Sequence, residues 1–134
     1  MLPRGVRNNN PLNIRVGNHW QGEVSEPTDT EFEQFQTMFY GVRAGFVLLK
    51  RYMMRYHLDT VAKIISRWAP PSENNTPEYI RRVASRIGVD PNLVISWYDR
   101  KTMLALVDAM ILQECGTTIA NDIIEDAYEA VLTQ

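Results

Sequence analysis

The sequence predicts an α+β fold that is mainly helical, with a small β-hairpin or meander near the N-terminus. Short alternations of apolar and polar residues occur before residue 37, whereas apolar residues recur at spacings of three and four between residues 40 and 132. The length of 134 residues and the 45% hydrophobic content suit one domain with one core. We therefore expect a single domain over 1–134, with a β region over 1–37 and a helical bundle over 40–132.

The β region is predicted from three short alternating segments. They cover residues 14–16, 20–24 and 32–35. Turn-forming residues separate them, with Gly17-Asn18 after the first segment and Pro27-Thr28-Asp29 before the third. This order predicts a hairpin or a three-strand meander.

Five helices are predicted from apolar periodicity and from residues typical of helix ends. They cover residues 41–56, 61–68, 76–88, 99–116 and 118–132. Asp59 is the expected cap of the second helix, which Pro70-Pro71 ends. Thr76-Pro77 is the expected start of the third helix and Gly88 its end. The acidic last helix is expected to cover the core, with the docking of a partner as the alternative.

Composition excludes several classes of protein. The net charge of −2 gives no strong attraction to nucleic acid, and no apolar run approaches the roughly 20 residues that span a bilayer. Cys115 is the single cysteine, so no internal disulfide can form, and His19 and His57 do not have a zinc-binding spacing. We expect no metal and no cofactor, synthesis in the reducing bacterial cytoplasm, and no signal peptide or membrane insertion.

The helix predicted over 99–116 ends on a carboxylic acid. Met103, Val107, Met110 and Ile111 form its apolar stripe, and the next step of three or four residues reaches Glu114. Burial beside apolar side chains disfavours the charged form of a carboxyl group and raises its pKa. Glu114 is therefore a candidate general acid; the alternatives are an outward rotation at a frayed helix end or pairing with an arginine such as Arg43 or Arg81.

Four segments resemble motifs of the lysozyme-like superfamily, which includes goose-type lysozymes, lytic transglycosylases and bacterial endo-β-N-acetylglucosaminidases. The segment "ILQECG" resembles the helix end that carries the catalytic glutamate, and "NNNPLNIRVGNHWQGE" resembles the strand segment of the glucosaminidases. Two further segments are similar to transglycosylase regions that come later in the chain than the glutamate: "TVAKIISRWAPP" and "TPEYIRRVASRIG". The pattern as a whole resembles small phage and prophage virion proteins with a muralytic role.

The order of these segments departs from the family pattern. In the family the glutamate precedes the asparagine-rich strand, whereas here its motif comes near the end of the chain. We interpret this order as a circular permutation, with the usual first helix moved behind the last and joined through residues 89–98. The asparagines near the N-terminus would then form a wall of the substrate cleft.

The resemblance implies a set of site residues. Glu114 would be the general acid and Tyr79 would orient it by a hydrogen bond. Glu23 and Glu26 are candidates for a second carboxylate, ahead of Asp29 and Glu31; if none of these hairpin acids points inward, a lytic transglycosylase is favoured over a hydrolase. The loop residue Glu73 is a separate, reserve candidate for catalysis. The predicted substrate contacts are Asn9, Asn10, Asn13, Trp20 and Tyr40. Trp68 and Trp97 are assigned to the core or an interface.

The expected function is cleavage of peptidoglycan glycan strands by a muramidase, a glucosaminidase or a lytic transglycosylase. Its partners would be glycan strands and virion or tail components, and the protein would be virion-associated or released to the cell wall by a phage or secretion route. One alternative is a non-catalytic phage structural or glycan-binding protein. Another is a helix-turn-helix DNA-binding protein, with a turn at Gly88 and a basic face made by Arg81, Arg82 and Arg86.

Overall fold

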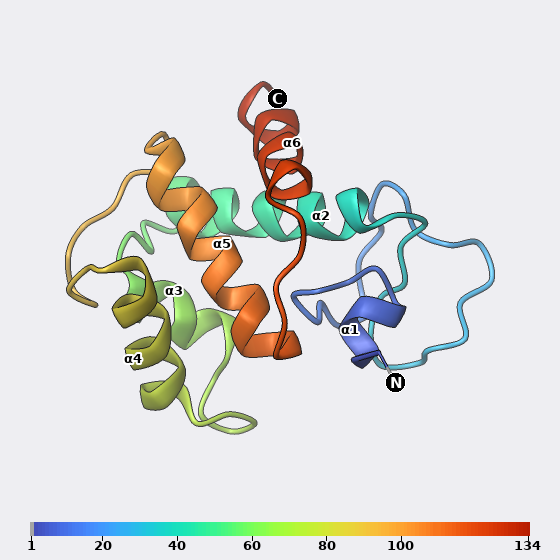
Figure 1. Ribbon diagram of the computed structural model, residues 1–134, viewed down its shortest axis with the longest axis horizontal. Coiled ribbons are helices and arrows are strands. Elements are labelled where there is room, and N and C mark those ends of the chain that lie inside the picture. The colour runs from blue at the N-terminus through green and yellow to red at the C-terminus, as the bar shows by residue number, and fades with distance from the viewer. Residues whose placement is uncertain (1) are drawn as a thin grey trace.

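The computed structural model describes residues 2–134, and these residues form a mainly helical fold, as predicted (Figure 1). The α-helices are α1 (Arg4–Arg7), α2 (Met38–Lys50), α3 (Val61–Trp68), α4 (Thr76–Ile87), α5 (Arg100–Cys115) and α6 (Asn121–Leu132). A short π-helix, η1 (Arg51–Arg55), continues α2. In Figure 1, α2 crosses the middle of the molecule, α3 and α4 lie on one side, and α1 with the long loop that follows lies on the other.

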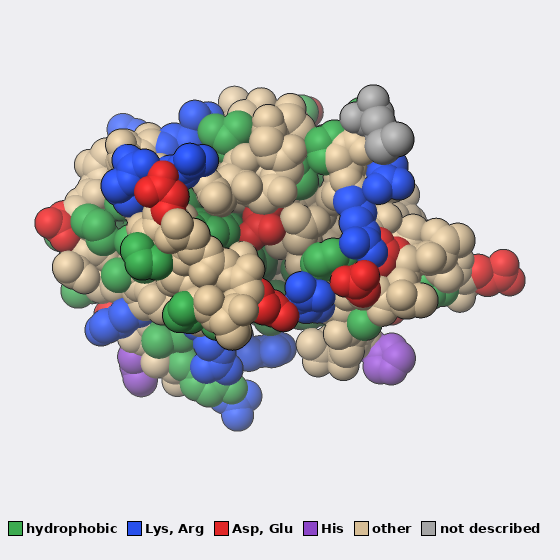
Figure 2. Space-filling view, turned by 90° about the horizontal axis from the view of Figure 1, so that it is seen from below, with side chains coloured by type: hydrophobic (Ala, Val, Ile, Leu, Met, Phe, Trp, Pro, Cys, Tyr) green, Lys and Arg blue, Asp and Glu red, His purple; other side chains and the backbone are tan. Residues whose placement is uncertain are grey.

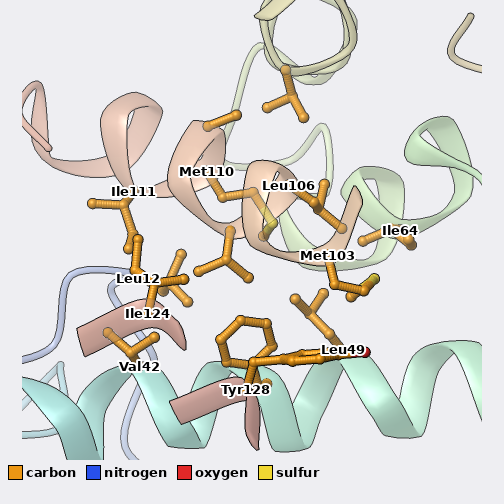
Figure 3. Packing of buried hydrophobic residues seen from close by; sticks show 14 of the residues in the cluster. Leu12, Val42, Leu49, Ile64, Met103, Leu106, Met110, Ile111, Ile124 and Tyr128 are labelled. Carbon is orange, nitrogen blue, oxygen red and sulfur yellow. The ribbon is translucent and has the colours of Figure 1, made fainter. Parts of the chain in front are cut away.

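The core lies between α2 and α5, and α6 closes it (Figure 3). The predicted stripe of α5 is buried, since Met103, Val107, Met110 and Ile111 have no exposed surface. On α6, Ile124, Ala127, Tyr128 and Val131 are buried. The phenol of Tyr128 donates a hydrogen bond of 2.8 Å to the carbonyl of Trp97, which is also buried. The last helix therefore covers the core, and Trp97 belongs to the core.

The first residues of the chain are part of this core. Leu12 has no exposed surface and Ile14 is 6% exposed. The chain approaches α2 so closely that a methyl group on Gly41 would overlap the backbone carbonyl of Asn9. The N-terminal segment is therefore held by packing, and Gly41 is required because it has no side chain.

Helix ends agree with the prediction in type and differ by one or a few residues in position. Asn75 and Thr60 cap α4 and α3, one residue away from the predicted Thr76 and Asp59, and α6 begins at Asn121 instead of 118. Asp99 caps α5 by accepting a hydrogen bond from the backbone of Thr102. The predicted glycine ends hold, since Gly88 and Gly116 are both left-handed.

The predicted β-hairpin does not form among residues 2–134. The only pairings there are two isolated antiparallel bridges, Arg15 with Phe32 and Glu23 with Phe35. Side-chain amides bind backbone groups of this region: Asn10 donates to the carbonyl of Glu33 and to that of Ile14, which also accepts a hydrogen bond from the backbone of Glu33. Such side-chain bonds compete with regular strand pairing. The β region is thus an irregular segment that side-chain amides stabilise through hydrogen bonds to its backbone.

The structure does not contain the predicted helix-turn-helix. That motif joins its two helices by a turn of about three or four residues. Here α4 ends at Ile87 and α5 begins at Arg100, and residues 88–99 between them are irregular. Arg81 and Arg82 pair with Glu78, and Arg86 pairs with Asp108. The proposed basic face is therefore neutralised within the protein.

Candidate active site

A pocket of about 420 Å³ lies between the N-terminal region on one side and the end of α2, η1, α3 and the loop after α3 on the other. One wall is formed by Asn13, Ile14, Arg15, Asn18, Trp20 and Phe32, the other by Leu48, Tyr52, Trp68, Ala69, Pro70, Glu73 and Asn74, with Glu114 also in the lining. Figure 2 shows a face with a hollow near its centre, in which acidic atoms are surrounded mostly by neutral ones. The pocket thus offers aromatic rings, amides and carboxyl groups to a ligand.

Glu114 lies on the last turn of α5 and accepts two hydrogen bonds. The side-chain amide of Asn13 donates to Oε1 at 3.0 Å, and the phenol of Tyr79 donates to Oε2 at 2.9 Å. Each oxygen therefore has a donor from a different part of the chain, one from the N-terminal wall and one from α4. The two donors fix the orientation of the carboxyl group toward the pocket.

Burial controls the protonation of Glu114. It raises the pKa of this carboxyl above the ordinary value of 4.5, and it outweighs the hydrogen bonds from Asn13 and Tyr79, which lower that pKa. Smaller effects of Trp68 and Arg15 also lower it. Burial and the nearby Glu114 raise the pKa of Tyr79, so its phenol remains a donor. Glu114 consequently holds its proton to a higher pH than a solvated glutamate.

Local backbone geometry brings the wall and the acid together. Asn13 has a left-handed backbone with φ of 53°, a conformation that asparagine tolerates better than most residues. The thiol of Cys115, directly after the acid, donates to the carbonyl of Pro11 at 3.1 Å. Gly5 lies against the same thiol, where an added methyl group would come within 2.7 Å of its sulfur. The end of α5 is therefore packed directly on the turn that carries Asn13.

A weak ion pair connects the two walls of the pocket. Arg15, from the N-terminal wall, lies 3.6 Å from Glu73, which belongs to the loop between α3 and α4. The Arg15 guanidinium also lies over the ring of Phe32 and 3.8 Å from Glu31. Both side chains of the cross-pocket pair are more than half exposed, so solvent screens their attraction.

The structure brings together four of the predicted site residues. Glu114, Asn13 and Tyr79 are in direct contact, and Trp20 lies on the pocket wall. Glu73, held in reserve by the sequence argument, is the other carboxylate in the lining. Trp68, which the sequence assigned to the core or an interface, is half-buried and packs against the core, and it also lines the pocket.

Two of the predicted asparagine contacts face inward instead. Asn10 is fully buried, and its amide binds the backbone of Ile14 and the carbonyl of Glu33, so no ligand can reach it. Asn9 donates to the carbonyl of Phe35 and does not line the pocket. These amides satisfy backbone groups of an irregular segment, which is why they are directed away from solvent.

The pocket lining does not include Tyr40, Glu23 or Glu26. Tyr40 packs edge-to-face on Phe39, and Glu23 accepts a hydrogen bond from the backbone of Trp20. Glu26 is exposed. The predicted roles of Glu23 and Glu26 depended on a regular hairpin, in which alternate residues share a face, and that hairpin does not form. Tyr40 lies on the first turn of α2.

The lower-ranked acids of the same region have structural contacts. Asp29 pairs with Arg4 at 2.7 Å and accepts a hydrogen bond from Asn8. These contacts hold the pKa of Asp29 well below its usual range. Glu31 is exposed and lies within 4 Å of Arg4 and Arg15. Neither acid is part of the pocket lining.

Glu33 is a buried acid that the sequence argument missed. Burial raises its pKa to about 7, and a hydrogen bond with Glu23 acts in the same direction. One of its carboxyl oxygens has no hydrogen-bond partner. The signal in the sequence was its spacing from Phe35, because residues two apart in an extended segment share a face. Glu33 does not line the pocket.

Comparison with known proteins places the chain in a family. No protein-family model matches the sequence. Protein P5 of Pseudoalteromonas phage PM2 is 42% identical over 118 residues, which cover 85% of this chain and 72% of that protein. The chain belongs to the family of phage protein P5. This relationship confirms the phage association expected from the sequence.

Two further observations describe this member of the P5 family. In the part of the chain that the structure describes, no helix combines the length and the apolar character needed to cross a membrane. Among the same residues, no cluster of three or more histidine, cysteine, aspartate or glutamate side chains could hold a metal ion.

Proposed function

We propose that this P5-family protein cleaves glycosidic bonds in peptidoglycan glycan strands, with Glu114 as the general acid. The observation that carries the proposal is a carboxyl group with a raised pKa, oriented by Asn13 and Tyr79, in the lining of a pocket. Glycoside cleavage needs a proton donor for the leaving oxygen, and a carboxylic acid with a raised pKa supplies one near neutral pH.

The rest of the pocket suits an N-acetylated sugar. Trp20, Trp68 and Tyr52 supply aromatic faces on which pyranose rings stack. Asn18 and Asn74 supply amide donors and acceptors for hydroxyl and acetamido groups. This combination of a few polar groups among aromatic ones is typical of small-molecule sites.

Whether the pocket contains a second carboxylate decides between hydrolysis and lytic transglycosylation. Glu73 is the carboxylate in the lining besides Glu114, so in a hydrolase it would activate water or stabilise the oxocarbenium centre, and the product would have a reducing end. Without such a group, the sugar's own 6-hydroxyl attacks and leaves a 1,6-anhydro end. None of the hairpin acids lines the pocket, which on the sequence argument alone favours a transglycosylase. The presence of Glu73 in the lining is the observation that supports hydrolysis instead.

The proposal retains the resemblance to the lysozyme-like superfamily and its circular permutation. A permuted chain requires the asparagine-bearing segment and the glutamate helix to meet although they lie at opposite ends of the sequence. The hydrogen bond between Asn13 and Glu114, which are 101 residues apart, supports this arrangement. The phage relationship supports a virion-associated role, in which the protein is made in the bacterial cytoplasm and reaches the wall with the particle or at release.

Digestion of purified sacculi followed by mass analysis of the soluble products tests the function. We expect reducing muropeptides from the wild type and a loss of about 1000-fold or more in rate for Glu114→Gln, which keeps the shape and removes the acidic proton. Glu26→Gln is the matched control, because Glu26 is exposed and outside the pocket lining. Undiminished cleavage by Glu114→Gln would refute the assignment of the acid.

A second candidate function is glycan binding without turnover, as part of the virion. The P5 relationship favours it, since a phage protein can use such a pocket for adhesion alone. The two functions separate in the same experiment. Wild-type protein that sediments with sacculi and releases no soluble products is a binding protein.

A further inference from the structure

Three arginines without acidic partners lie close to the pocket. Arg51, Arg55 and Arg67 are exposed, and none of them forms an ion pair within residues 2–134. The acid nearest in sequence, Asp59, pairs with Lys63 at 3.7 Å. In a chain with a net charge of −2, three unpaired arginines at one place need an explanation.

Two tyrosines contact two of these arginines, and the third, Arg51, directly precedes one of them in the sequence. The Arg67 guanidinium lies 5.7 Å from the ring centre of Tyr52 and 5.4 Å from that of Tyr56. Arg55 lies 5.7 Å from the ring centre of Tyr56, and the charge of Arg51 acts on Tyr52. We call these five residues, Arg51, Tyr52, Arg55, Tyr56 and Arg67, the basic strip. Stacking on aromatic faces leaves the edges of the guanidinium groups free to bind an anion.

An irregular helix end produces this arrangement. The π-helix η1 closes with a hydrogen bond of 3.3 Å from the backbone of Tyr56 to the carbonyl of Arg51. His57 then ends the helix with φ of 56°, in the left-handed region. A single π-turn is wider than an α-turn, and such turns often occur at functional sites. Here the turn places Tyr52 and Tyr56 against the same arginine of α3.

The basic strip is continuous with the pocket. Tyr52 belongs to both, since its ring also packs edge-to-face on Trp68 with 6.1 Å between ring centres, and both rings line the pocket. Figure 2 shows several groups of basic side chains on the face that contains the hollow, one of them along its lower edge with hydrophobic side chains among them. A polymer that fills the pocket and passes Tyr52 would reach these arginines.

We propose that the basic strip binds the carboxylates of the stem peptides carried by a glycan strand in the pocket. This inference rests on the proposed function, because it takes its ligand from that substrate. Arginine binds carboxylates with paired N–H donors, and stem peptides of peptidoglycan carry carboxylates at intervals along a neutral sugar backbone. The pocket would hold the sugars, and the basic strip would hold the charged branches.

Sedimentation with sacculi tests the proposal in a Glu114→Gln background, which leaves the polymer intact. We expect the triple variant Arg51→Gln, Arg55→Gln, Arg67→Gln to bind sacculi on the order of tenfold more weakly, because three charge-assisted contacts are lost. The matched control is the triple variant Arg81→Gln, Arg82→Gln, Arg86→Gln, which has the same net charge as the strip variant. Its three arginines lie outside the basic strip and form ion pairs with Glu78 and Asp108. Chitohexaose, a neutral glycan, should bind both variants and the parent equally.

A second test measures how binding depends on salt. It uses protein whose basic strip is intact, so it does not depend on how the strip variants fold. Binding to sacculi should weaken as sodium chloride rises, whereas binding to chitohexaose should not. Three outcomes would overturn the proposal. The strip variant could bind sacculi as tightly as the parent, or it could lose the same affinity for sacculi and for chitohexaose. The three arginines could also strengthen binding only to duplex DNA or to anionic vesicles. Arginine-dependent sacculus binding without any cleavage by the wild type would refute the enzymatic function and leave the basic strip assigned.

Discussion

Glu114 couples proton binding to folding. In the unfolded chain its pKa has the ordinary value of 4.5, and burial raises it in the folded protein. Between these two pKa values the folded state binds more protons than the unfolded state, so the free energy of unfolding falls as the pH rises. The carboxyl group therefore lowers the free energy of unfolding at neutral pH relative to acidic pH.

Tyr79→Phe should raise the pKa of Glu114 further, because the phenol donates to Oε2 and favours the charged form. The variant should lose about 1 kcal/mol of unfolding free energy from the missing hydrogen bond. NMR titration of the Glu114 side-chain carbonyl measures the shift directly, and the alkaline limb of the pH–rate profile should move in the same direction. A pKa that is unchanged or lower in Tyr79→Phe contradicts the role of Tyr79. Tyr98→Phe is the control, since Tyr98 is exposed.

The position of a site residue could be derived from periodicity only where a helix carries it, whereas Asn13 and Trp20, in the irregular segment, were predicted from the resemblance and from their side-chain chemistry. Helix periodicity placed Glu114 on the buried side of α5, and the motif around Tyr79 placed the phenol on the helix that faces it. Arg15 and Glu73 meet through two irregular segments, whose paths no periodicity specifies. The inward orientation of Asn10 depends on which backbone groups lack partners, and this is decided only after the chain has folded.

At the scale of elements, the fit between α2 and the N-terminal segment depends on Gly41. Gly41→Ala should lower the free energy of unfolding by about 1–3 kcal/mol, because the added methyl group overlaps the carbonyl of Asn9, which is backbone and cannot rotate away. Gly45→Ala is the matched control on the same helix. Its methyl group meets the side chain of Leu12, which can change rotamer, so the loss should be smaller. Urea denaturation compares the two, and equal losses would contradict this explanation.

The helices were predictable because their signals are local. Asp99, Gly88 and Gly116 cap helices through their own backbone or side-chain geometry, and the structure contains all three ends. The β region failed because strand pairing is not local. Gln34, for example, accepts hydrogen bonds from the backbones of Thr28 and Asp29 and so replaces ladder bonds that the alternation alone would predict.

At the scale of the whole molecule, the irregular N-terminal segment and the helices share one core. Leu12→Ala should therefore cost about 2–5 kcal/mol, as much as a comparable substitution in a helix such as Leu106→Ala, because both side chains are fully buried. Leu2→Ala should change stability by less than about 0.5 kcal/mol, because Leu2 is 60% exposed. Thermal unfolding of the three variants checks this. A small loss for Leu12→Ala would mean that the segment unfolds independently.

The hydrogen bond between Asn13 and Glu114 joins residues from the two ends of the chain. During translation the ribosome makes Glu114 101 residues after Asn13, so a nascent chain that ends before position 114 has a wall and no acid. The proton donor and its partner can meet only after the segment that carries Glu114 has left the exit tunnel. Under the proposed function, translation products that stop before Glu114 would be inert.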